Sequence, residues 1–151
     1  MDFDDPNYEH RPYDKWQAYG QAKTSNVLFT VALEKRLAPR GVHALAVHPG
    51  VIQTELSRHL SAEELEAVKS SLPSGSAMRL KSVAQGAATT VWAASSPALE
   101  GQGGLYLEDC HIGAAAEPGI DGGVEAFALD PAAAERLWTV SEQLVGERFD
   151  L

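Results

Sequence analysis

Near its amino terminus the chain reads Trp16-Gln17-Ala18-Tyr19-Gly20-Gln21-Ala22-Lys23, inside a long segment of helical character. Tyr19 and Lys23 are four residues apart, so on a helix they lie one turn apart on the same face. The Lys23 ammonium would then favour the Tyr19 phenolate and lower the pKa of the tyrosine from about 10. A tyrosine tuned in this way can exchange a proton with a substrate oxygen near neutral pH. The spacing also arises by chance, and for the pair alone a helical tyrosine beside a surface lysine is the more common explanation.

The segments after this stretch predict an α/β fold. Helical periodicity predicts a helix over residues 15–38, with Asp14 as its N-cap. Residues 42–47 form an apolar run with little polar alternation, which is typical of a parallel strand covered on both faces. Residues 48–54 would therefore lie at the carboxyl end of a central strand, where open α/β sheets bind ligands. The buried stripe of the first helix is expected to consist of Tyr19, Ala22, Phe29, Leu33 and Leu37.

The second half of the chain predicts two more helices and one more strand. Ser82 can cap a helix over residues 83–94, and Pro131 suits the first turn of a helix over residues 131–145. A glycine-rich turn at 101–104 leads into a short strand at 105–107, and residues 110–123 are expected to form a loop. Residues 55–71 are polar and partly helical, with 62–70 as their best helical window, and residues 72–76 are expected to form a loop. Trp92 and Trp138 are expected in the core.

This order of elements resembles the carboxyl-terminal half of the short-chain dehydrogenase/reductase family. The shared features are the Y-x-x-x-K helix, the next parallel strand and the P-G-x-x-x-T loop from Pro49 to Thr54. Residues 3–6, 19–26 and 48–50 are most similar to the retinol-dehydrogenase-like branch, which includes the WW-domain oxidoreductases. The resemblance implies an α/β fold that forms the carboxyl-terminal half of a Rossmann-type doubly wound parallel sheet. Residues 1–151 would then be one partial domain, with the Tyr/Lys helix, two strands, a substrate lid and a terminal helix.

The same resemblance implies a role for each candidate site residue. Tyr19 would be the general acid/base, and Lys23 would assist it and hydrogen-bond the nicotinamide ribose of NAD or NADP. Pro49 and Gly50 would shape the loop under the nicotinamide; otherwise they form an ordinary turn at the end of a strand. The candidate catalytic residues are Tyr19 and Lys23, and the candidate cofactor-binding residues are Tyr19, Lys23, Pro49, Gly50, Ile52 (through its backbone) and Thr54 (through its hydroxyl).

Two other features of the family are not found in this sequence. The sequence has no strand followed by a Gly-rich turn and a helix, which is the arrangement that binds the pyrophosphate. The family's catalytic serine lies upstream of the tyrosine helix, but the first serine of this sequence, Ser25, already lies inside that helix. We therefore expect the amino-terminal cofactor-binding half to be absent from this chain. Alone, the chain is expected to be inactive and to bind NADPH weakly or not at all. Its unpaired strand edge and exposed apolar surface would favour self-association or the missing half.

Composition narrows the remaining classes of function. The 151 residues suffice for one domain, with 44% hydrophobic and 22% charged residues. A net charge of −9 argues against nucleic acid as a partner. No apolar run approaches the roughly 20 residues of a membrane span. The single cysteine, Cys110, is compatible with a reducing compartment. A cytoplasmic protein is therefore expected. The histidines show no ligand spacing, and no metal site is predicted.

Two classes of function stay open at this point. The first is an oxidoreductase that interconverts a small alcohol and a carbonyl with NAD or NADP. The alternative is a non-catalytic truncated product that acts as an interaction module through its apolar face. A Ser-His hydrolase has no support, because no G-x-S-x-G elbow is present.

Overall fold

The computed structural model describes residues 1–52, 61, 63, 64, 66, 80–120 and 122–151. These residues form two compact units. The first unit comprises Met1–Ala46, Gly101–Leu105 and Glu125–Leu151, and the second comprises Val47–Glu100 and Tyr106–Val124. The helical window expected at 62–70, and most of the lid expected over 55–81, lie outside the described residues.

The long helix of the first unit is α1, Lys15–Leu37, which confirms the helix expected from the sequence. The Asp14 side chain accepts a hydrogen bond from the Gln17 N–H at 2.8 Å and so caps the first turn. At its other end α1 continues into a 3₁₀ turn, Ala38–Arg40. Gly41 ends this turn with a φ of 72°, a left-handed conformation that glycine adopts without a Cβ penalty.

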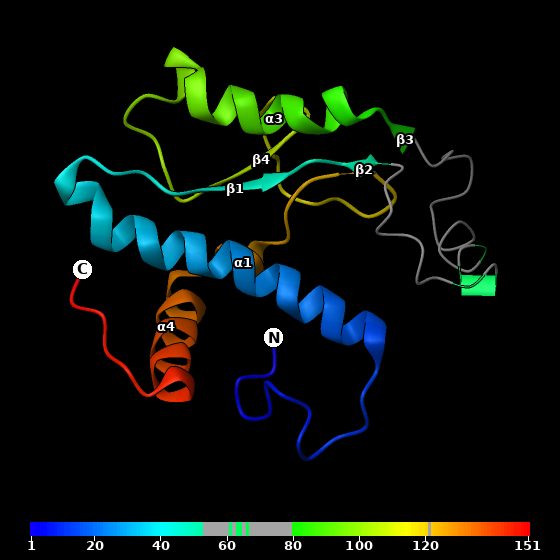
Figure 1. Ribbon diagram of the computed structural model, residues 1–151, viewed down its shortest axis with the longest axis vertical. Coiled ribbons are helices and arrows are strands. Elements are labelled where there is room, and N and C mark those ends of the chain that lie inside the picture. The colour runs from blue at the N-terminus through cyan, green and yellow to red at the C-terminus, as the bar shows by residue number, and fades with distance from the viewer. Residues whose placement is uncertain (53–60, 62, 65, 67–79, 121) are drawn as a thin grey trace. The chain divides into compact units, whose positions relative to one another are not determined.

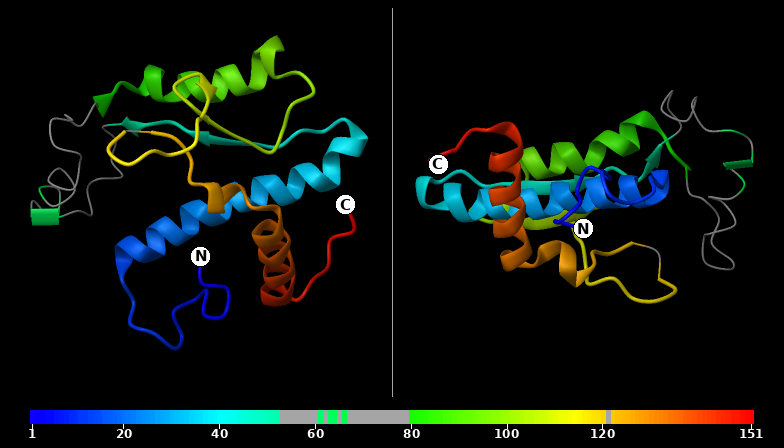
Figure 2. Two further views of the ribbon diagram at one scale, coloured as in Figure 1. Left: turned by 180° about the vertical axis from the view of Figure 1, so that it is seen from behind. Right: turned by 90° about the horizontal axis from the view of Figure 1, so that it is seen from below.

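Helix α4, Pro131–Val145, packs across α1 and builds the core of the first unit (Figures 1 and 2). Asp130 caps α4 by accepting from the Ala132 N–H at 3.0 Å, and Gly146 ends it with a φ of 71°. The prediction that Trp138 is a core residue is confirmed. The buried core consists of Leu28, Ala32, Ala134, Leu137 and Trp138.

The buried stripe expected for α1 was wrong at three of its five positions, whereas Leu33 and Leu37 are half-buried, with Leu33 packed against the core. Tyr19 is 57% exposed, and Ala22 and Phe29 are exposed as well. The buried residues of α1 are Val27, Leu28, Thr30 and Ala32. Two neighbouring stripes on this helix both carry apolar residues, and helical periodicity alone does not choose between them. In the first unit, α4 packs on the stripe that contains Leu28 and Ala32.

The strand expected at 42–47 is observed as β1, Leu45–His48. It starts later than expected because the Ala44 N–H bonds at 2.8 Å to the Glu34 carboxylate, which also contacts His43 Nδ1 at 2.9 Å. β1 belongs to a three-stranded sheet of order β1-β4-β5. Strand β4, Leu105–Glu108, confirms the strand expected after the glycine-rich turn.

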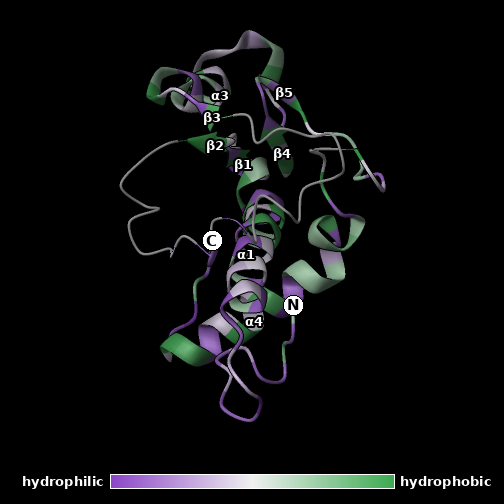
Figure 3. Cartoon of the chain, turned by 90° about the vertical axis from the view of Figure 1, so that its right-hand side faces the viewer, coloured by the Kyte–Doolittle hydropathy of each residue, from purple (hydrophilic) through white to green (hydrophobic). Residues whose placement is uncertain are grey.

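Three short strands were not predicted. β5, His111–Ile112, pairs antiparallel with β4 inside the segment expected to be a loop (Figure 3). β2, Val51–Ile52, pairs in parallel with β3, Leu80–Lys81, so that Val51 lies opposite Leu80 and Ile52 opposite Lys81. The residues directly after β1 therefore belong to a second small sheet instead of forming a simple loop.

Helix α3, Val83–Ser95, follows β3 directly and has the expected Ser82 cap. Ser82 and Gln85 form a capping box, in which each side chain accepts from the other residue's backbone N–H. Gly86 lets α3 approach β2, because a Cβ at this position would lie 2.2 Å from Ile52 Cδ1. Trp92 is half-buried, so its expected core position was wrong.

Hydropathy varies along the helices instead of being uniformly apolar (Figure 3). Among the described residues, no helix is long and apolar enough to cross a membrane.

Candidate active site

Tyr19 and Lys23 lie together on an exposed part of α1. The helix places Lys23 Nζ 5.3 Å from the centroid of the Tyr19 ring, so the ammonium lies over the ring, as the four-residue spacing predicts. Tyr19 is 57% exposed. The pair therefore lies in contact on one face of α1, with the tyrosine exposed.

Pro49, Gly50 and Ile52 lie together in the second unit, after β1. Gly50 has a φ of 81°, a conformation that favours glycine and turns the chain from β1 into β2. Ile52 lies in β2, and its side chain packs against Gly86 of α3. Thr54 lies outside the described residues. The structure thus places the described candidate residues in two groups, Tyr19 and Lys23 in the first unit and Pro49, Gly50 and Ile52 in the second.

Lys81 and Asp109 are polar residues of this region that the sequence analysis missed. Lys81 Nζ donates a hydrogen bond to the Pro49 carbonyl at 3.3 Å and pairs with the Asp109 carboxylate. The hydrogen bond from Lys81 is the main cause that lowers the pKa of Asp109, and the nearby His48 and His111 lower it further. Neither residue belongs to a recognisable motif, so no sequence signal could have found them.

Asp109 stands in a tight turn between β4 and β5. Asp109 and Cys110 both have positive φ, 45° and 59°, which is the pattern of a type I′ hairpin turn. The Cys110 N–H donates to the Thr89 hydroxyl of α3 at 3.2 Å. The usual sequence signal for such a turn is Asn-Gly or Asp-Gly. The hairpin was not predicted because its turn residues are Asp and Cys.

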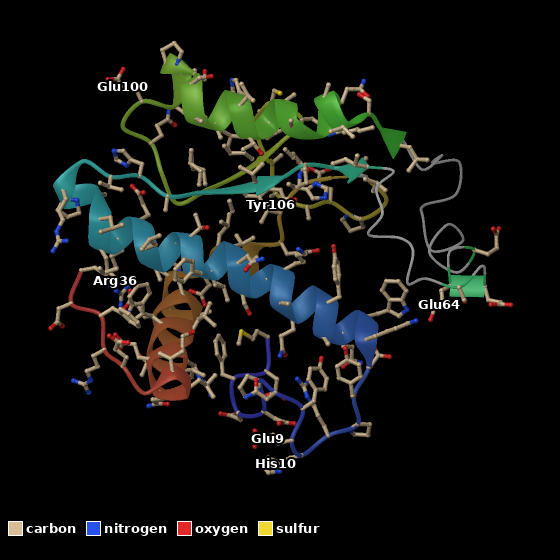
Figure 4. The ribbon with its side chains drawn as sticks, in the orientation of Figure 1. Glu9, His10, Arg36, Glu64, Glu100 and Tyr106 are labelled. Atoms are coloured by element: carbon tan, nitrogen blue, oxygen red, sulfur yellow. The ribbon has the colours of Figure 1, made fainter. Side chains whose placement is uncertain are left out.

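Tyr106 of β4, which is labelled in Figure 4, stacks on His48 with the ring centroids 6.2 Å apart. This ring stacking fits a structural role for His48 at the end of β1. Burial, and then the carboxylates of Glu108 and Asp109, raise the pKa of Tyr106 from 10.0 to about 12. Glu108 is buried and accepts from the Gly123 N–H at 2.7 Å.

This shift predicts a loss of stability at alkaline pH. Between about pH 10 and about pH 12 the unfolded tyrosine releases its proton while the folded one keeps it, so stability falls as the pH rises. Tyr106→Phe removes this contribution. We expect the free energy of unfolding, measured by urea denaturation, to fall less in Tyr106→Phe than in the wild type between about pH 8 and about pH 11. An equal fall in both proteins would show that Tyr106 ionises alike in the folded and unfolded states.

In the described part of the chain, no three His, Cys, Asp or Glu side chains lie close enough to hold a metal ion. Cys110 is exposed and unbonded to another cysteine.

Comparisons with known proteins identify the family. The chain is 46% identical over 143 residues to a probable oxidoreductase of Streptomyces lividans, covering 91% of this chain and 48% of that protein. It is 42% identical over 135 residues to a short-chain dehydrogenase/reductase of Penicillium rubens, covering 88% and 39%. It is 35% identical over 146 residues to retinol dehydrogenase 14 of Homo sapiens, covering 97% and 40%. No protein-family model matches the chain.

A solved structure supports the same relationship at the level of the fold. The crystal structure of an uncharacterised protein from Mycobacterium paratuberculosis matches all of this chain and 47% of its own, with a TM-score of 0.63 and 30% identity. The chain belongs to the short-chain dehydrogenase/reductase family, as the sequence resemblance indicated, and matches the carboxyl-terminal half of its relatives. It spans about half the length of the curated relatives it matches. The predicted fold class, the carboxyl-terminal half of an α/β sheet, is confirmed.

Proposed function

We propose that this chain carries the proton-transfer half of a nicotinamide-dependent oxidoreductase that interconverts an alcohol and a carbonyl. The observation that supports this most is the Tyr19–Lys23 pair, with the ammonium 5.3 Å from the centroid of an exposed tyrosine ring. In the reducing direction, Tyr19 donates its hydroxyl proton to the substrate oxygen. In the oxidising direction, the phenolate accepts that proton, and the Lys23 ammonium stabilises the phenolate.

The residues of both groups fit a nicotinamide cofactor. Lys23 is exposed, so its ammonium is available to ribose hydroxyls. Gly50 has no side chain of its own, although the stem of Lys81 lies against one side of its Cα, and the Ile52 backbone would serve the carboxamide. When bound, NAD or NADP would supply or accept the hydride at the substrate carbon, while the chain handles the proton at the oxygen. Tyr19, Lys23, Pro49, Gly50, Ile52 and Thr54 would hold it.

We assign the rest of the cofactor site to an amino-terminal segment outside the sequence of this chain. The chain covers 48% of its Streptomyces lividans relative and has no Gly-rich turn for a pyrophosphate. We propose that an amino-terminal half like that of the relatives supplies this turn and the serine that would complete the acid/base site. The substrate class is a small alcohol or carbonyl compound, and retinol, named for the human relative, is one compound to test.

Lys23→Ala tests the cofactor assignment. We call the polypeptide that the native source produces, at its full length, the native-length protein. In that protein we expect Lys23→Ala to weaken NADPH or NADH binding by about 10- to 100-fold, since a hydrogen bond from a charged group contributes about 1.5–3 kcal/mol. The measurement is a fluorescence titration of the dissociation constant with each dinucleotide.

Lys15→Ala is the matched control. Lys15 lies on the same helix, with its Nζ also 5.3 Å from an aromatic centroid, which is that of Trp16 and not that of Tyr19. Equal dissociation constants for wild type, Lys15→Ala and Lys23→Ala would contradict the role of Lys23. If the wild-type native-length protein binds neither dinucleotide, the chain is better explained as a non-catalytic interaction module.

A further inference from the structure

The turn after β1 is held from outside by a lysine side chain. A Cβ built on Gly50 would lie 2.6, 2.7 and 2.8 Å from Nζ, Cε and Cδ of Lys81. The stem of Lys81 therefore lies directly on the Cα of Gly50, and its ammonium donates to the Pro49 carbonyl at 3.3 Å. Lys81 thus touches both residues of the turn, although it is far from them in the sequence.

Two further contacts fix this lysine. Its backbone is part of β3, where Lys81 lies opposite Ile52 of β2. Its ammonium pairs with the Asp109 carboxylate, and its side chain is only 21% exposed. Most lysines keep their ammonium in water on a mobile stem, so a lysine packed along a glycine is unusual.

Asp109 is in turn placed by a buried hydroxyl. Asp109 and Cys110 both have positive φ, a conformation that non-glycine residues keep only where their surroundings impose it. The β4–β5 pairing and the Thr89 hydroxyl, which accepts from the Cys110 N–H at 3.2 Å, impose it here. Thr89 is 1% exposed on α3. A continuous set of contacts therefore runs from α3 through Thr89, Cys110 and Asp109 to Lys81 and the Pro49–Gly50 turn.

We propose that Lys81 is a positioning residue, held by Asp109, that fixes the Pro49–Gly50 turn in the conformation that receives the nicotinamide. The assignment of the turn to the cofactor rests on the proposed function. The immobilisation of the turn by Lys81 rests on the contacts alone, so the two can be tested separately.

Amide hydrogen exchange tests the immobilisation. In the native-length protein, Lys81→Met keeps most of the side-chain stem and removes the ammonium. We expect exchange at the amides of Gly50, Val51 and Ile52 to become about fivefold faster. This is the effect of losing an ion pair whose contribution lies at the upper end of the values found for exposed pairs. Lys81→Arg keeps the charge and should restore slow exchange. Lys35→Met is the control, because it removes an ion pair of Nζ to Glu135 Oε1 at 3.2 Å in the other unit.

Steady-state kinetics with NADPH and NADH test the consequence for the cofactor. Lys81→Met should raise the KM for the dinucleotide about fivefold and leave kcat within about twofold, as expected for loss of a binding interaction that is the same in the ground and transition states. A variant that is only less stable would show a lower kcat, because less enzyme is folded, instead of a raised KM alone. Lys81→Arg would not restore the wild-type kinetics in that case.

The outcomes separate the inference from the proposed function. Unchanged exchange at Gly50–Ile52 in Lys81→Met overturns the inference, even if the wild type uses NADPH. Faster exchange with a raised KM, both restored by Lys81→Arg, supports it. Faster exchange in a protein that binds neither dinucleotide supports immobilisation by Lys81 and overturns the assignment of the turn to a cofactor. Faster exchange with an unchanged KM overturns the positioning role.

Discussion

Tyr19→Phe should lower kcat of the native-length protein by about 10²- to 10⁴-fold, because a positioned proton donor contributes rate acceleration of that size. The substitution removes only the hydroxyl, and Tyr19 is exposed, so the fold should not change. The measurement is the rate of oxidation of NADPH and NADH with a panel of aldehydes and ketones, together with cofactor titration of the same variant.

Tyr13→Phe is the matched control for this prediction. Tyr13 is another exposed tyrosine of the first unit, and it lies in the loop before α1, without a lysine one turn away. It should keep the wild-type kcat. A Tyr19→Phe protein whose kcat stays within about twofold of the wild type would contradict the acid/base role, since loss of a general acid is far more costly.

Leu28→Ala should give the largest loss of stability. Leu28 is 1% exposed in the core between α1 and α4, next to the pair of stacked rings Phe29 and Trp138, whose centroids are 5.7 Å apart. Truncating a buried leucine removes buried apolar surface and leaves a cavity, which together cost about 2–5 kcal/mol. Urea unfolding should show this loss as a lower midpoint with an unchanged m-value.

Leu144→Ala is the control for burial. Leu144 lies on α4 and is 57% exposed, so the same change of side chain should cost less than about 1 kcal/mol. Similar losses for the two variants would mean that α1 and α4 do not pack through Leu28 in solution.

The helices were predictable from the sequence because their signals are local. Asp14, Ser82 and Pro131 mark the starts of α1, α3 and α4, and each lies within a few residues of the backbone groups it affects. The Tyr19–Lys23 geometry was predictable for the same reason, since one helical turn fixes it. The catalytic roles of both residues stay predictions.

The strands and the surroundings of the turn depend on contacts between distant residues. β2 exists because Val51 and Ile52 meet Leu80 and Lys81, and β5 exists because a hairpin forms through residues with positive φ. No local pattern reports such pairings, since strand preference depends on the partners. The buried face of α1 was mispredicted for a related reason, because the position of α4 decides which apolar stripe is covered.

The proposed hydride transfer between a nicotinamide and a substrate carbon can be tested directly with isotopes. The test uses the native-length protein with NADPH or NADH that carries deuterium in both C4 positions of the nicotinamide, a panel of aldehydes and ketones that includes retinal, and mass spectrometry of the products. We expect an alcohol that carries deuterium on the former carbonyl carbon, formed by the wild type and nearly lost in Tyr19→Phe. No dinucleotide oxidation with any compound, or an alcohol without deuterium, would contradict it.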